Sequence, residues 1–179
     1  MKKNKISKNW INKQRRDIFV RRSKVEGYRS RAVYKLQEID QKFRIFKNGM
    51  SVIDLGAAPG SWSQYVLKNV KNGKIVSIDF KDFEKIGNIH QIKGDFTDDR
   101  YKKEIVDYFG VKVDVVLSDL AVNTTGNKNL DSIYTGELCM EAMKFSKETL
   151  KSDGKFISKI FMGSTFNEIV SEAKKIFKE

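Results

Sequence analysis

The stretch VIDLGAAPGSWSQYV, residues 52–66, runs from an apolar segment through a loop of small residues into a segment with helical spacing. The loop holds Gly56, Gly60 and Pro59, and Pro59 is the only proline in the chain. Glycine lets a backbone approach a ligand closely, and proline favours the start of a helix. The stretch therefore predicts a strand, a ligand-binding loop and a helix, in that order.

The rest of the chain repeats this alternation of strands and helices. Apolar runs predict strands at 51–55, 74–80, 88–96, 113–119 and 155–162, and helical spacing predicts helices at 30–43, 61–70, 98–109, 130–150 and 165–177. Strands separated by helices indicate an α/β fold with a mostly parallel central sheet and helices on both faces. We expect a single domain over residues 1–179, because no repeat or linker divides the chain.

The net charge of +12 is distributed unevenly along the chain. Residues 1–35 hold 13 Lys and Arg against two acidic residues, a net of +11, and the remaining residues are nearly neutral. Trp10, Phe19, Tyr28 and Tyr34 lie among these charges. Clustered cations bind nucleic-acid phosphates, and aromatic side chains can stack on bases. We interpret residues 1–35 as an RNA-binding segment; the alternatives are a solvated tail or a transit peptide.

Other features of the sequence indicate where the protein works. No apolar stretch approaches the roughly 18 residues needed to span a membrane, and the basic start lacks the apolar run of a secretory signal. Cys139 is the only cysteine, so no internal disulfide can form, which fits a reducing compartment. His90 and Cys139 have no metal-ligand spacing around them. The sequence predicts a cytoplasmic protein with no membrane and no metal partner.

Four acidic residues lie at or near the ends of predicted strands. They are Asp54, Asp79, Asp95 and Asp119. In parallel α/β sheets ligands bind at the carboxyl ends of the strands. A single acid in such a place can simply cap a turn or a helix. Four in succession indicate a binding site.

The glycine spacing suggests which ligand this site binds. The loop reads G-x-x-x-G, which matches neither a phosphate-binding P-loop nor the dinucleotide fingerprint G-x-G-x-x-G. A nucleoside that carries an amino acid fits better than a pyrophosphate. Asp79 suits ribose hydroxyls, and Asp95 suits an adenine amino group with Phe96 beside it for packing. The pattern favours S-adenosylmethionine.

The motifs YRSRAVYKL, DLGAAPGSWSQ, GDF, SDLAVN and KFISKIF occur in the order and at roughly the spacing of the FtsJ/RrmJ family. The chain resembles this family over about residues 8 to 179. The resemblance implies a Rossmann-like methyltransferase fold and S-adenosylmethionine-dependent 2′-O-methylation of a ribose in RNA, with S-adenosylhomocysteine as product. It also implies a uridine of large-subunit ribosomal RNA as the target, the large ribosomal subunit as partner, and a monomer.

The resemblance implies three catalytic residues, Lys35, Asp119 and Lys159. Lys159 would be the general base, Lys35 would position the hydroxyl, and Asp119 would orient Lys159 near the methyl donor. A lone cation within a predicted apolar strand supports Lys159 independently, although a lysine reaching solvent at a strand edge would look the same. The expected cofactor contacts, from the loop, the acids and the resemblance, are Gly56, Pro59, Gly60, Trp62, Asp79, Asp95, Phe96 and Asp119.

The chain departs from the family pattern at two places. Val122 stands where the family usually has proline, although Asn123 is still present. The family also continues after its last helix into a strand hairpin that carries a catalytic glutamate, whereas this sequence ends at Glu179. Without that hairpin the predicted strand 155–162 would lie at a sheet edge. We interpret the sequence as a fragment; a partner chain over that edge is the alternative.

Three other functions are alternatives to ribose methylation. A methyltransferase for base amino groups usually carries an Asn/Asp-Pro-Pro-aromatic signature, and SDLAVN does not match it. An NAD-dependent oxidoreductase is disfavoured by the glycine spacing. A non-catalytic RNA-binding or ribosome-assembly factor on the same fold stays open, and it predicts RNA binding without turnover.

Overall fold

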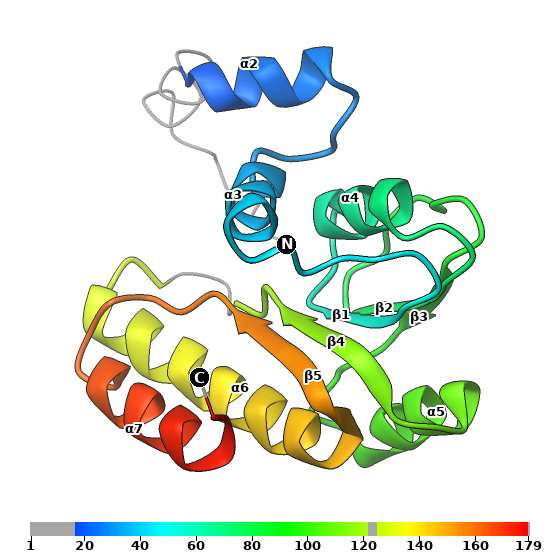
Figure 1. The fold of residues 1–179 in the computed structure, drawn as a ribbon. Coiled ribbons are helices and arrows are strands. Elements are labelled where there is room, and N and C mark those ends of the chain that lie inside the picture. Colours follow the sequence, from blue (N-terminus) through cyan, green and yellow to red (C-terminus); the bar gives the residue numbers. More distant parts are fainter. Residues whose placement is uncertain (1–16, 122–124, 179) are drawn as a thin grey trace.

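The structure, a computed structural model, describes residues 17–121 and 125–178. Its centre is a five-stranded parallel sheet in the order β3-β2-β1-β4-β5 (Figure 1). The strands are β1 (Ser51–Leu55), β2 (Lys74–Asp79), β3 (His90–Lys93), β4 (Val113–Ser118) and β5 (Leu150–Ser158). The helices are α2 (Ile18–Val25), α3 (Val33–Phe43), α4 (Ser61–Asn69), α5 (Asp99–Phe109), α6 (Lys128–Thr149) and α7 (Phe166–Ile176). The predicted α/β fold with a parallel sheet is confirmed.

Helices cover both faces of the sheet, and each face has its own apolar core. On one face α3 and α4 pack on residues such as Val52 and Leu117. On the other face α5 and α6 pack on residues such as Ile53 and Ile78, and α7 packs against α6 (Figure 1). A strand buried on both faces needs apolar residues at successive positions, which is why β1 has apolar residues at 52, 53 and 55.

The order of the strands determines where a ligand can bind. From β1 the chain proceeds outward through β2 to β3, and it then returns to the other side of β1 for β4 and β5. The connections that leave the carboxyl ends of β1 and β4 therefore diverge to opposite faces, and a crevice forms between them. The Asp119 amide donates to the Leu55 carbonyl at 3.0 Å, so the two strand ends stay in contact.

Several predicted boundaries differ from the structure. The predicted strand 155–162 is β5, which begins at Leu150 directly after α6 and ends at Ser158. Lys159 therefore follows the strand and does not lie within it. The predicted strand 88–96 is shorter, because β3 ends at Lys93 and Asp95 lies in the turn before α5. The helix α2 was not predicted; the Asp17 side chain caps its start by accepting from two backbone amides.

β5 is an edge strand, as the sequence predicted. Among the described residues it pairs with β4 alone, and its side chains are mostly exposed or half-buried. Within 17–121 and 125–178 no helix is long and apolar enough to cross a membrane. Trp10, Val122, Asn123 and Glu179 lie outside the described residues, and the interpretation as a fragment stays a prediction.

Candidate active site

The loop between β1 and α4 has a backbone that only glycine adopts readily. Gly56 and Gly60 have φ values of 76° and 105°. The Gly56 and Ala57 amides both donate to the Ile78 carbonyl, at 2.9 and 3.1 Å, so the loop begins against the end of β2. A Cβ on Gly56 would lie 2.8 Å from the Leu120 nitrogen. The loop therefore fits closely between the ends of β2 and β4, as a backbone that cradles a ligand requires.

Asp79, the last residue of β2, holds this loop in place. One of its carboxylate oxygens accepts from the Ala58 amide at 2.9 Å, and the other accepts from the Lys81 amide at 2.8 Å. An ionised carboxylate has about four acceptor positions, so Asp79 can still accept from a ligand hydroxyl. Asp79, which the sequence predicted as a ribose contact, thus fixes the shape of the loop 56–60.

Asp54, the fourth residue of β1, is completely buried beneath the loop. It accepts from the Ser63 hydroxyl, which lies 2.7 Å from the Ser77 hydroxyl, while its other carboxyl oxygen has no hydrogen-bond partner in the described structure. Burial, with a smaller contribution from the carboxylates of Asp119 and Asp79, raises the pKa of Asp54 to about 7. Asp54 is therefore protonated in a mildly acidic solution.

This raised pKa predicts a pH-dependent stability. The folded protein keeps the Asp54 proton up to about pH 7, whereas the unfolded chain loses it near its ordinary pKa. Between these values the folded state binds more protons, so the free energy of unfolding falls as the pH rises, by roughly 4 kcal/mol. About 3 kcal/mol of this decrease lies between pH 5 and pH 8, and urea unfolding of Asp54→Asn at these two pH values is expected to lack it. The exposed Asp153→Asn should behave as the unsubstituted protein, and an equal decrease in all three would contradict the assignment.

Asp119 and Lys159 form an ion pair at the carboxyl ends of β4 and β5. The Lys159 amide donates to the Ser118 carbonyl at 2.9 Å, which continues the β4–β5 ladder by one residue and places the two side chains together. Their side chains are 20% and 37% exposed. Burial raises the pKa of Asp119, and the charge of Lys159 opposes that effect. The pair is thus half desolvated and still accessible from one side.

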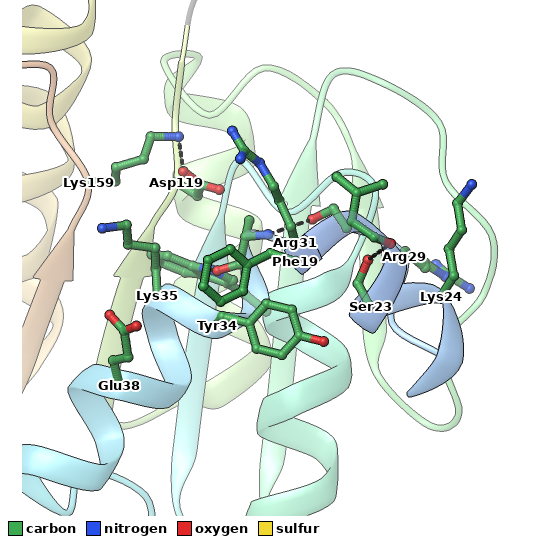
Figure 2. Close-up of a pocket in the computed structure, with 14 residues that line it drawn as sticks. Phe19, Ser23, Lys24, Arg29, Arg31, Tyr34, Lys35, Glu38, Asp119 and Lys159 are labelled. Atoms are coloured by element: carbon green, nitrogen blue, oxygen red, sulfur yellow. Dashed lines mark hydrogen bonds and ion pairs between the residues drawn. The ribbon is translucent and has the colours of Figure 1, made fainter. Parts of the chain in front are cut away.

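An open cavity of about 650 Å³ lies beside this ion pair. Figure 2 shows that Lys35, from the first turn of α3, faces the same space as Asp119 and Lys159. The structure therefore brings the three residues that the family resemblance implied for catalysis to one cavity. Trp62 also lines it.

The remaining predicted cofactor contacts have different surroundings. The Trp62 indole donates to the Ala32 carbonyl at 2.9 Å, so Trp62 ties α4 to the start of α3. Phe96 is 3% exposed and packs edge-to-face on Phe145 in the core, so its ring is not open to a ligand. Asp95 is exposed and accepts from the Thr97 amide at 2.9 Å. Asp95 thus lies at the turn after β3, and Phe96 supports that turn from the core.

The other wall of the cavity was not predicted residue by residue. It comes from α2 and from the segment that leads into α3, and its members are Phe19, Val20, Ser23, Lys24, Arg29 and Arg31. The signal in the sequence was the mixture of basic and aromatic residues within 1–35. That signal indicated a surface for RNA, but it did not say which of these side chains would face the catalytic residues.

A parallel sheet with a tight glycine loop after its first strand and an acid at the end of its second is typical of Rossmann-like folds, which bind nucleoside cofactors at this edge of the sheet. The chain belongs to the FtsJ-like methyltransferase family, whose sequence model matches residues 28–179. It is therefore an enzyme, as predicted.

Individual relatives agree with this family. The chain is 67% identical, over its whole length and 88% of the relative's, to the ribosomal RNA large subunit methyltransferase E of Pelagibacter ubique. It is 43% identical to the protein of the same name from Rickettsia akari, over 96% of this chain and 78% of that one. A solved ribosomal RNA methyltransferase from Plasmodium falciparum superposes with a TM-score of 0.79 at 34% identity, over 85% of this chain and 88% of that one.

Proposed function

We propose that this enzyme transfers the methyl group of S-adenosylmethionine to the 2′-hydroxyl of a ribose in large-subunit ribosomal RNA. The target nucleotide in this proposal is a uridine. The observation that carries the proposal is the ion pair of Lys159 with Asp119, which faces Lys35 across one cavity beside the glycine loop. The names of the relatives support ribosomal RNA as the substrate.

The cofactor would lie over the carboxyl ends of β1, β2 and β4. Gly56 and Gly60 let the loop under its amino-acid end pack tightly on the protein, since a Cβ on either would meet a neighbouring protein atom at 2.8 Å or closer. Asp79 would accept from the ribose hydroxyls, and Asp95 would accept from the adenine amino group. When bound, S-adenosylmethionine supplies a methyl carbon made electrophilic by the adjacent sulfonium.

The catalytic residues would make the ribose oxygen nucleophilic. Lys159, in its neutral amine form, would accept the proton of the 2′-hydroxyl as the oxygen bonds to the methyl carbon. Lys35 would hold the hydroxyl in line with that carbon. Asp119 would keep the Lys159 amine directed into the cavity and stabilise the ammonium that forms on it. The proton then leaves Lys159 to solvent, which restores the base.

The RNA would lie along the wall made by α2 and α3. Lys24, Arg31 and Lys35 place positive charge on the side of the cavity from which a nucleotide must enter. Phe19 is 41% exposed and offers a ring on the same wall. These residues support the assignment of residues 1–35 to RNA binding. We further expect a cytoplasmic monomer that acts on RNA within the large ribosomal subunit.

Transfer of a labelled methyl group from S-adenosylmethionine tests this function. The substrates are large ribosomal subunits that lack the modification and the naked RNA extracted from them. Alkaline hydrolysis locates the label, because a 2′-O-methyl group protects the adjacent phosphodiester bond from cleavage. Label in an alkali-resistant dinucleotide supports ribose methylation. Label on a base, or RNA and cofactor binding without transfer, would overturn it.

Lys35 can be tested against a second lysine on the same helix. Lys35→Ala is expected to lower kcat by about 100-fold, because the hydroxyl is then no longer held for attack. Lys42→Ala removes an exposed lysine from the end of α3 that does not line the cavity, and it should keep nearly full activity. Single-turnover kinetics measures both. Equal losses in the two variants would indicate a general effect of charge on RNA binding.

A further inference from the structure

Two arginines of the motif YRSRAVYKL have different surroundings, although the sequence presents them as equivalent members of a basic segment. The Arg31 side chain is 53% exposed and pairs with Asp17. The Arg29 side chain is only 21% exposed, and its guanidinium donates to the backbone carbonyls of Pro59, Glu84 and Lys85. Arg29 therefore does not resemble a phosphate-binding residue.

The contacts of Arg29 join the loop 56–60 to residues 84–85, which lie between β2 and β3. One terminal nitrogen of the guanidinium donates to the Pro59 carbonyl at 3.1 Å and to the Glu84 carbonyl at 2.7 Å. The other donates to the Lys85 carbonyl at 3.2 Å and lies 3.5 Å from the Glu84 carboxylate. The four N–H groups of the two terminal nitrogens thus have four acceptors. A Cβ on Gly60 would lie 3.0 Å from the guanidinium, so Arg29 also packs directly on the loop.

The segment around Arg29 is bonded to α4 as well. The Gln64 side chain accepts from the Arg29 amide at 2.9 Å and donates to the Gly27 carbonyl at 3.1 Å. The Ser30 and Ser61 hydroxyls are 2.7 Å apart. These contacts fix the connection between α2 and α3 to the loop 56–60 and to the start of α4. The conformation of the cofactor loop and the position of the cavity wall are therefore linked.

We propose that Arg29 is a positioning residue that couples cofactor binding to RNA binding. A cofactor bound to the loop would fix the position of the Pro59 carbonyl. Because Arg29 donates to that carbonyl, the segment that carries Arg31 and Lys35 would then also be restricted. The coupling is reciprocal, so bound RNA also strengthens cofactor binding by the same factor. The inference rests on the proposed function, because it takes the loop as the cofactor site and the α2–α3 wall as the RNA site.

The test compares RNA affinity with and without saturating S-adenosylhomocysteine, at several salt concentrations. For the unsubstituted protein the RNA Kd is expected to fall about fivefold or more when S-adenosylhomocysteine is present. For Arg29→Ala the two Kd values should agree within about twofold, because alanine makes none of these contacts. Arg29→Lys offers one ammonium on a shorter side chain in place of two donor nitrogens, so it should keep at most part of the coupling. The salt slope, which is the slope of the logarithm of the RNA Kd against the logarithm of the salt concentration, should not change in Arg29→Ala. Arg31→Ala should lower it by about one.

Two further variants make the result specific to the backbone contacts. Glu84→Ala removes a side chain that is 91% exposed and leaves all three carbonyl acceptors, so the coupling should stay. Gln64→Ala removes the second link to the segment and should weaken the coupling, and it provides the test if Arg29→Ala does not fold. If Arg29→Ala lowers the salt slope and weakens RNA binding equally with and without S-adenosylhomocysteine, Arg29 is a phosphate contact and the proposal is overturned.

Failure of this inference can be told apart from failure of the proposed function. An unsubstituted protein that methylates ribose but binds RNA equally with and without S-adenosylhomocysteine overturns the coupling alone. A protein that does not transfer label to ribose overturns the proposed function, whatever Arg29 does. Loss of coupling in Glu84→Ala would assign the effect to the exposed ion pair instead of the carbonyl contacts.

Discussion

Lys159→Met is expected to lower kcat for methyl transfer by about 1,000-fold or more. General-base catalysis contributes on the order of 10²–10⁴ in rate, and loss of Lys159 also leaves the Asp119 carboxylate without its partner. Lys159→Arg should be similarly inactive, because a guanidinium keeps the charge but does not deprotonate at neutral pH. Single-turnover transfer of labelled methyl groups to the RNA measures both variants.

A lysine of the strand that precedes Lys159 provides the control for it. Lys155 lies on β5 with an exposed side chain, so Lys155→Met should retain nearly full activity. S-adenosylhomocysteine binding should stay within a few-fold of the unsubstituted value in all three variants, which shows that the cofactor site is intact. More than a tenth of the original kcat in Lys159→Met would mean that another group removes the proton.

Gly56→Ala is expected to be the most damaging small substitution in the cofactor loop. The added Cβ would lie 2.8 Å from the Leu120 nitrogen and 3.1 Å from the Asp119 carbonyl carbon, and φ is +76°. Backbone atoms cannot rotate away as a side chain can, so the loop and the end of β4 must separate. We expect cofactor affinity to fall by at least 30-fold and the free energy of unfolding by roughly 3 kcal/mol.

Gly110→Ala separates the two causes of that loss. Gly110 ends α5 with a similar φ of +68°, but a Cβ there would meet nothing within 4 Å. In this variant the left-handed backbone conformation is the only source of strain, and it costs about 1 kcal/mol. Its cofactor affinity should not change. Calorimetric titration with S-adenosylhomocysteine and urea unfolding measure both effects. Similar results for the two glycines would show that strain, and not the close approach to β4, governs Gly56.

The sequence predicted the first half of the fold better than the second. The strand at 51–55 and the start of the helix at Ser61 match the structure, because adjacent apolar residues indicate a strand buried on both faces and the glycine loop ends it abruptly. β5 was misplaced because residues 151–153, which follow the buried Leu150, are polar and exposed. Its extent depends on pairing with β4, which local sequence does not encode.

The same limit applies to the site. Lys35, Asp119 and Lys159 could be named from the family motifs, but their meeting in one cavity depends on the order of the strands. Phe96 was expected beside the cofactor because it follows Asp95, yet the turn after β3 leaves Asp95 exposed and buries the Phe96 ring in the core. The contacts of Arg29 could not be predicted, because their carbonyl acceptors are present at every residue.

Asp79 holds the loop 56–60 through hydrogen bonds, and we also propose that it binds the ribose of the cofactor. The loop contacts limit which residues can replace it during evolution. Its two oxygens accept from the Ala58 and Lys81 amides on either side of it, and an asparagine would turn an NH₂ group toward one of these donors. A glutamate would carry the oxygens too far by one methylene. Selection on the loop alone would therefore keep aspartate here, even in a descendant that bound a different nucleoside. New cofactor preferences would have to arise at positions that the loop does not need, such as the exposed Asp95.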